Sequence, residues 1–294
     1  SPNNLEEGVS PTIAGTVGEG GLTVYLYTTA GCQGVSVSTV SESDGSFSAQ
    51  ISASENDETM VYGRTRDLAG LFSICTPAHD AYTYVHDTEL PDGPSEVVIA
   101  PAMTEEKPAA NENNPKLTGS AEEGSTLRFY GTGFCDHEQW GEPALGEGAV
   151  EDFSGEGVAI TVEDNSTTSI FVTVTDAAGN TSACVNTGLV YVEDSLPPEP
   201  PAIGASDPAS PSNAGTVVSL SGMSEPGANV VVYADPDCNN SGFKGYGKAD
   251  DEGVFQITDI AVDANSTTVF YARATDLVGL FSTCSVEGFS FVHD

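Results

Sequence analysis

The stretch RTRDLAGLFSIC at residues 64–75 recurs almost unchanged as RATDLVGLFSTC at residues 273–284. A shorter version, VTDAAGNTSAC, occupies residues 174–184. Each copy ends on a cysteine and is followed by a similar closing tripeptide, at residues 85–87, 192–194 and 292–294. Matches at several fixed offsets indicate a tandem array of three units.

The cysteines follow the same repeat, with two in each unit and six in the chain. Since the placement is equivalent in all three units, we expect pairing within each unit, as Cys32–Cys75, Cys135–Cys184 and Cys238–Cys284. The sequence has no C-x-x-C pair, so a zinc site or a thioredoxin-like redox motif has no support. Evenly repeated cysteines are typical of disulfides formed in an oxidising, extracellular compartment.

Short apolar and alternating runs predict that each unit is all-β. The runs at 22–27, 127–130 and 230–233 are rich in β-branched and aromatic residues, and those at 59–65, 168–175 and 268–275 alternate with period two. Asp44-Gly45 and Asp251-Glu252-Gly253 are typical of hairpin turns. Units of about 100 residues with this pattern predict immunoglobulin-like β-sandwiches.

We therefore predict three immunoglobulin-like domains, at residues 1–90, 91–197 and 198–294. Proline-containing stretches, DTELPDGP at 87–94 and DSLPPEPP at 194–201, separate the units. Proline favours an extended and stiff backbone, so an elongated array is expected.

Composition narrows the function classes. The 294 residues include 8 basic and 44 acidic ones, a formal net charge of −36. The acidic residues are spread along the whole chain, and such a surface repels nucleic acid and anionic membranes. The sequence has no apolar run long enough to span a membrane and no signal peptide, so we expect a mature, monomeric fragment of a longer chain.

Three motifs resemble the bacterial immunoglobulin-like repeats of large surface adhesins and related secreted proteins. They are TDAAGN at 175–180, EDSLP at 193–197, and SEPGA at 224–228 with its echo AEEGS at 121–125. The resemblance implies a stalk or adhesive array at the cell surface, with calcium near domain junctions in several members. The first and third units depart from the pattern, because they carry LAGLF and LVGLF at the turn.

The turn aspartates Asp67, Asp176 and Asp276 are the candidate metal ligands. Each turn joins the last two strands of its unit and should face the preceding linker, so we expect Asp176 to approach Asp87 and Glu89. By the same reasoning Asp276 should approach Asp194. Such clusters suit Ca²⁺, which takes oxygen ligands. The alternative is that each aspartate caps its own turn through backbone N–H groups.

The remaining candidates are weaker. The only tryptophan, Trp140, lies in a stretch peculiar to the second unit and could stack on a sugar or a protein surface, although a lone tryptophan in a β protein is usually a core residue. No catalytic constellation is evident around the histidines or serines. The sequence therefore predicts a non-enzymatic structural or adhesive segment, with recognition of a cell-surface protein or glycan as the alternative.

Overall fold

The computed structural model describes residues 9–135 and 143–294, and these residues are almost entirely β. Six antiparallel sheets draw their strands from three successive stretches of the chain, here called the first (12–86), second (95–192) and third (202–293) segments. None of the helices in the described ranges has the length and apolar character of a membrane span.

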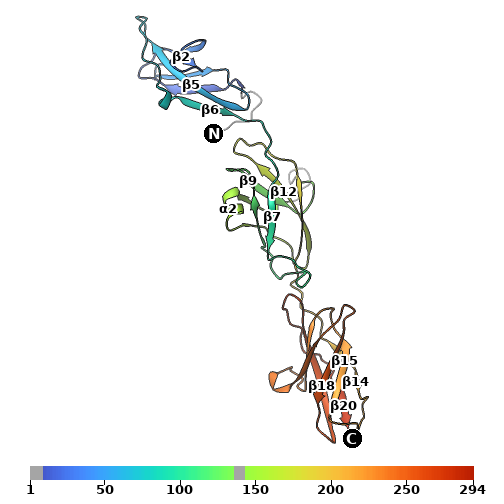
Figure 1. The fold of residues 1–294 in the computed structure, drawn as a ribbon. Coiled ribbons are helices and arrows are strands. Elements are labelled where there is room, and N and C mark those ends of the chain that lie inside the picture. Colours follow the sequence, from blue (N-terminus) through green and yellow to red (C-terminus); the bar gives the residue numbers. More distant parts are fainter. Residues whose placement is uncertain (1–8, 136–142) are drawn as a thin grey trace. The chain divides into compact units, whose positions relative to one another are not determined.

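The third segment has seven strands in two sheets (Figure 1). One sheet has the order β14-β15-β18 and the other the order β17-β16-β19-β20. The strands are β14 (Ala202–Asp207), β15 (Val217–Met223), β16 (Asn229–Tyr233), β17 (Phe243–Lys248), β18 (Val254–Ala261), β19 (Ser266–Thr275) and β20 (Phe289–His293). This arrangement is an immunoglobulin-like sandwich.

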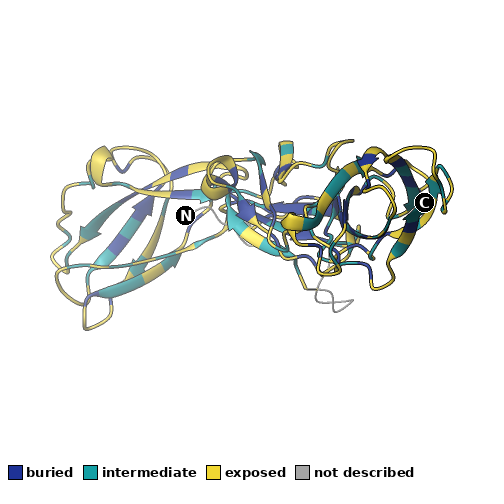
Figure 2. Cartoon of the chain, turned by 90° about the horizontal axis from the view of Figure 1, so that it is seen from below, coloured by how far each residue is buried: buried dark blue, intermediate teal, exposed yellow. Residues whose placement is uncertain are grey.

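Alternation along the strands forms the core of this sandwich. Leu220 of β15, Val232 of β16 and Phe270 of β19 are fully buried and belong to one apolar cluster. The residues between them are intermediate or exposed, so dark blue alternates with teal and yellow along the strands in Figure 2. Because the cluster takes side chains from both sheets, they pack face to face.

The first segment has the same four-stranded sheet but a smaller partner sheet. The four-stranded order is β3-β2-β5-β6, and among the described residues β1 pairs with β4 alone. The strands are β1 (Thr12–Thr16), β2 (Thr23–Tyr27), β3 (Ser36–Val40), β4 (Ser46–Gln50), β5 (Asp57–Arg66) and β6 (Tyr82–His86). A short 3₁₀ turn, η2 (Ala78–Asp80), precedes β6.

The second segment carries a helix that the sequence did not suggest. Its sheets have the orders β10-β9-β12-β13 and β11-β8-β7. The elements are β7 (Ser95–Ala100), β8 (Lys116–Ser120), β9 (Thr126–Tyr130), β10 (Gly146–Ala149), α2 (Val150–Ser154), β11 (Val158–Ala159), β12 (Thr167–Thr175) and β13 (Val185–Val192). Phe153 of α2 is fully buried, with its ring centroid 5.9 Å from that of Phe129.

The chain divides into two compact units whose boundary falls inside the second segment. One unit comprises residues 1–98, 116–160 and 170–188, and the other 99–115, 161–169 and 189–294. Division into three domains at 90/91 and 197/198 remains a prediction. Asp44-Gly45 and Asp251-Glu252-Gly253 do lie in turns, as expected. They are not hairpins, because β3 and β4, like β17 and β18, lie in different sheets and these turns cross between them.

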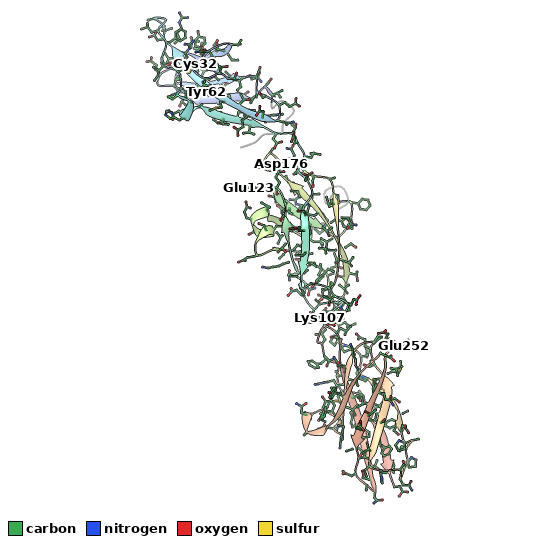
Figure 3. The ribbon with its side chains drawn as sticks, in the orientation of Figure 1. Cys32, Tyr62, Lys107, Glu123, Asp176 and Glu252 are labelled. Atoms are coloured by element: carbon green, nitrogen blue, oxygen red, sulfur yellow. A yellow bond between two sulfur atoms is a disulfide. The ribbon has the colours of Figure 1, made fainter. Side chains whose placement is uncertain are left out.

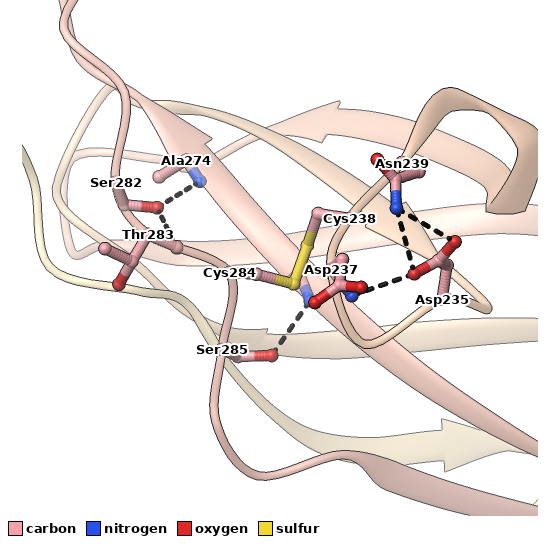
Figure 4. Close-up of a disulfide and its surroundings, with 10 residues drawn as sticks. Asp235, Asp237, Cys238, Asn239, Ala274, Ser282, Thr283, Cys284 and Ser285 are labelled. Carbon is pink, nitrogen blue, oxygen red and sulfur yellow. Dashed lines mark hydrogen bonds between the residues drawn. A yellow bond between two sulfur atoms is a disulfide. The ribbon is translucent and has the colours of Figure 1, made fainter.

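Three disulfides pair the cysteines as expected. Cys32–Cys75, Cys135–Cys184 and Cys238–Cys284 each have a Cα–Cα distance of 5.7 Å and span sequence separations of 43, 49 and 46. This distance falls within the ordinary range for disulfides. Each bond fastens the loop after one central strand to the loop after its neighbour, as Figure 4 shows for Cys238 and Cys284.

Candidate functional site

The candidate site is the hairpin turn that joins the last two strands of each segment. It begins at Asp67, Asp176 or Asp276 and turns at a glycine with positive φ: Gly70 (88°), Gly179 (95°) or Gly279 (97°). The conformation favours glycine because an L side chain there meets its own backbone. The same sequence pattern thus sets the same turn three times.

In each turn the aspartate accepts backbone N–H groups from the turn itself. Asp67 Oδ1 accepts from Leu71 N at 2.8 Å. Asp176 Oδ1 accepts from Ala178 N and Asn180 N at 2.8 and 2.9 Å. Asp276 Oδ1 accepts from Val278, Gly279 and Leu280 N at 3.0, 2.7 and 2.8 Å. One carboxylate oxygen in each case therefore caps the turn.

At the second segment's turn, an asparagine side chain connects the turn to the preceding linker. Asn180 Nδ2 donates to Asp176 Oδ2 at 2.8 Å and to the backbone carbonyl oxygen of Asp87 at 3.1 Å. Both Asp176 and Asn180 are buried, and Figure 3 shows Asp176 at the same end of its segment as Glu123. The amide satisfies the second carboxylate oxygen and ties the turn to the linker.

The third segment's turn lacks this amide, because Leu280 occupies the position equivalent to Asn180. Asp276 is 4% exposed, and its buried Oδ2 has no hydrogen-bond partner within residues 9–135 and 143–294. Partial loss of solvent around Glu225, together with the negative charges of Asp276 and Asp194, raises the pKa of the Glu225 carboxyl. The Glu225 carboxyl therefore lies in the field of two further carboxylates, and one oxygen of Asp276 is unsatisfied among the described residues.

The linker carboxylates cap their own turns. Asp87 Oδ1 accepts from Glu89 N at 3.0 Å, and Asp194 Oδ1 accepts from Leu196 N at 3.1 Å. Across residues 9–135 and 143–294, no three histidine, cysteine, aspartate or glutamate side chains are arranged to hold a metal ion. The calcium ligands named from the sequence therefore stay a prediction, and Trp140 lies outside the described residues.

A second anchor, which sequence reasoning missed, fixes the start of each linker. Asn56 and Asn165 lie at positive φ, just before β5 and within the turn before β12. Asn56 Oδ1 accepts from Thr88 N at 2.7 Å, and Asn165 Oδ1 accepts from Ser195 N at 3.0 Å. In the second segment the buried Glu193 Oε2 also accepts from Asn165 N at 2.6 Å. The linker therefore leaves its segment in a defined direction.

The first segment's turn exposes two leucines as well as an aromatic ring, whereas in the third segment's turn Leu277 and Leu280 are only partly exposed and Phe281 is the exposed side chain. Leu68 and Leu71 are 97% and 70% exposed, and Phe72 is about half exposed. The guanidinium carbon of Arg64 lies 4.3 Å from the Phe72 ring centroid. The chain has only 8 basic residues, and a similar pairing recurs in the third segment, where the guanidinium carbon of Arg273 lies 4.9 Å from the Phe281 ring centroid.

No protein-family model matches the sequence, and no curated protein matches it significantly. Among solved structures, a tetra-tandem repeat from the extending region of a large adhesion protein is 14% identical over 98% of this chain and 71% of that chain, with a TM-score of 0.32. Domains from titin are 14% identical over 99% and 96%, with a TM-score of 0.36. Eight N-terminal Ig domains of Down Syndrome Cell Adhesion Molecule are 13% identical over 100% and 34%, with a TM-score of 0.29. Similarity at this level assigns no family and no activity.

Proposed function

We propose that the chain is a non-catalytic extracellular segment, a structural or adhesive spacer of three immunoglobulin-like domains from a bacterial surface or secreted protein. The observation that carries the proposal is the buried Asn180 amide, which joins the turn of one segment to the linker before it. A spacer needs such fixed connections, because a free linker transmits neither direction nor distance. The three disulfides support an oxidising location.

The test is to measure how sharply the first connection is defined. Spin labels attached at Ser38→Cys and Glu123→Cys, both at exposed positions, report the distance between the first and second segments. We expect a narrow distance distribution in the otherwise unchanged chain. With Asn180→Leu added, the distribution should broaden. A distribution of equal width in both chains would contradict the spacer proposal.

Calcium binding is a subsidiary proposal, and the second linker is the better place for it. The buried, unpartnered Asp276 Oδ2 and the nearby charges of Asp194 and Glu225 favour a cation there. At the first linker, the second carboxylate oxygen of Asp176 already accepts a hydrogen bond from the Asn180 amide. Melting curves with calcium and then with a chelator are the test, using Asp276→Asn as the variant and Asp67→Asn as the matched control. Identical curves for the unchanged chain would exclude calcium.

Recognition of a surface protein is the second candidate function. The exposed Leu68, Leu71 and Phe72, with Arg64 beside them, favour it because aromatic and arginine side chains are enriched at binding hot spots. Binding of the chain to intact cells, compared with a Leu68→Ser/Leu71→Ser variant, tests it. Equal binding by both chains would remove this surface from consideration.

A further inference from the structure

The first segment has an open sheet edge where the other two segments have a strand. In the second segment β7 pairs with β8, and in the third β14 pairs with β15. The equivalent strand in the first segment, β1, pairs with β4 on one side only, within the part of the chain that the structure describes. β1 is therefore an unprotected edge, which proteins ordinarily cover or pair.

The hydrogen-bond register shows which groups face the open side. Val17 N donates to Gly45 O at 2.9 Å, and Ile51 N donates to Pro11 O at 3.0 Å. Since bonding alternates along an antiparallel strand, the odd-numbered residues of β1 bond to β4. The N–H and C=O groups of Thr12, Ala14 and Thr16 face the other way, where no strand of the described residues pairs with them.

Each segment has a glycine in the strand that corresponds to β1. The atoms around this glycine indicate which groups pack against the strand. A Cβ at Gly119 would lie 2.6 Å from Phe153 and 2.8 Å from the carbonyl oxygen of Ser95 in β7. A Cβ at Gly222 would lie 2.7 Å from Phe255 and would collide with the carbonyl oxygen of Ala202 in β14. Both glycines thus make room for an inner phenylalanine and an outer strand.

Gly15 of β1 has the contact with a phenylalanine, but within the described residues it lacks the contact with an outer strand. A Cβ there would have three ring atoms of Phe47 as its nearest neighbours, the first at 2.9 Å, and no carbonyl oxygen of the described residues comes closer than 3.8 Å. Phe153 and Phe255 are 0% and 1% exposed, whereas Phe47 is only partly buried. The glycine and the phenylalanine are both present, and the strand that would complete the arrangement is not among the described residues.

The missing strand leaves an opening into the core. Cavities of about 400 and 310 Å³ lie beside β1, and both are lined by Leu26, Phe47, Gly63 and Thr76. Elsewhere an apolar side chain of the extra strand meets the core: Ile99 of β7 is 7% exposed, and Ile203 of β14 packs against the third segment's apolar cluster. The opening is suited to one such side chain.

We propose that the edge of β1 and the groove beside it bind one further β-strand, antiparallel to β1 and supplied by polypeptide on its amino-terminal side. The occupant follows from the other segments, in which β7 and β14 each come from the stretch of chain directly before the strand they cover. It is extended and carries one apolar residue aimed at Phe47, with a backbone carbonyl over Gly15. Main-chain hydrogen bonds between β1 and the added strand supply the affinity. The apolar side chain fixes the register of the pairing by entering the groove.

The experiment supplies such a strand to the full chain. A copy of residues 199–207, which contains β14, is placed directly before Ser1, so that the copied Ile203 has the same sequence distance from Gly15 as Ile203 has from Gly222. Site-resolved hydrogen exchange then follows the amides of β1. We expect exchange at Thr12, Ala14 and Thr16 to slow by about tenfold or more. Ile13 and Gly15, already bonded to β4, serve as internal references.

The matched control is the same extension with Ile203→Asp in the added copy alone, which keeps length and linker but cannot fill the groove. Slower exchange with the first extension and not with the control supports the proposal. Equal exchange in the extended and unextended chains overturns it. Protection that appears in the unextended chain and grows with protein concentration also overturns it, because the occupant would then be a second copy.

Discussion

At the scale of single residues, Asp176 and Asp276 occupy equivalent turns but differ in the hydrogen bonding of their second carboxylate oxygen. Asp176 Oδ2 accepts a hydrogen bond from Asn180, whereas Asp276 Oδ2 is buried without a partner. An Asn side chain keeps the capping oxygen and places an amino group at the second position. In calcium-free buffer we therefore expect Asp276→Asn to stabilise its segment by about 1 kcal/mol and Asp176→Asn to destabilise its own by about 1 to 3 kcal/mol.

Hydrogen exchange of the strand amides in each segment measures both changes in the same full chain. Asp67→Asn is the control, because Asp67 caps an exposed turn through one oxygen, which accepts from Leu71 N. Its effect should be small. Effects of the same sign for Asp176→Asn and Asp276→Asn would contradict this view of the two turns.

Glu225 gives the third segment a pH dependence. Its pKa is raised, so the folded state binds this proton more readily than the unfolded chain does. The associated stability is present below the ordinary pKa of a glutamate and is lost as pH rises from there through the raised pKa of the folded state. Glu225→Gln should flatten this decline, as measured by exchange in β15 and β19. A decline of unchanged steepness in the variant would assign it to other carboxyls.

The sequence anticipated the turn aspartates but not the residues that decide their behaviour. Capping by Asp67, Asp176 and Asp276 follows from local turn chemistry and is the alternative to metal binding that the sequence offers. The Asn180 bond to Asp87 and the approach of Glu225 to Asp276 depend on groups far apart in the chain. Only the difference between asparagine and leucine at positions 180 and 280 hinted at them.

At the scale of elements, the loop before each second cysteine contains a serine that substitutes for a missing ladder bond. In the third segment Ser282 Oγ accepts from Ala274 N at 2.9 Å and donates to Thr283 O at 2.8 Å (Figure 4). Ser73 and Ser182 make the same pair of bonds. The serine and the disulfide together hold the loop against the central strand.

We expect the disulfide to contribute more than the serine to the stability of this loop. The Cys238–Cys284 separation is 46 residues, and closing a loop of this length stabilises by about 4 kcal/mol in the chain-entropy model. We therefore expect Cys238→Ala/Cys284→Ala to lower the unfolding free energy of the third segment by about that amount. Denaturant titration followed by exchange in β18–β20 measures the loss. A loss below about 1 kcal/mol would show that the reduced loop is already ordered.

Strands were the most predictable elements, because alternation and cysteine spacing are local signals. β5, β12 and β19 include the alternating runs, and all three disulfides pair as expected. Helix α2 was not predictable, because its five residues are too short to show a helical period. The crossing turns at Gly45 and Gly253 look like hairpins, since sequence does not reveal which strands pair.

At the scale of the whole molecule, the three-domain division makes its own prediction. Residues 198–294 contain both sheets of the third segment and the Cys238–Cys284 bond. Expressed alone, this stretch should unfold in one cooperative transition and keep its disulfide. Calorimetry on the excised stretch is the measurement. Absence of a cooperative transition would place the boundary elsewhere, because the stretch would then depend on contacts with the rest of the chain.

The disulfides also limit how the chain responds to tension. Pulling on the two ends can straighten only the residues outside each closed loop, because the loop is bypassed by a covalent bond. In the third segment the loop hides a sequence separation of 46, roughly 160 Å of contour length at full extension. Force spectroscopy should therefore show lengthening steps that grow by about this amount per segment when reductant is added. Under oxidising conditions, a segment that unfolds under load therefore lengthens by less than the same segment does after reduction, because the closed loop stays out of the stretched chain.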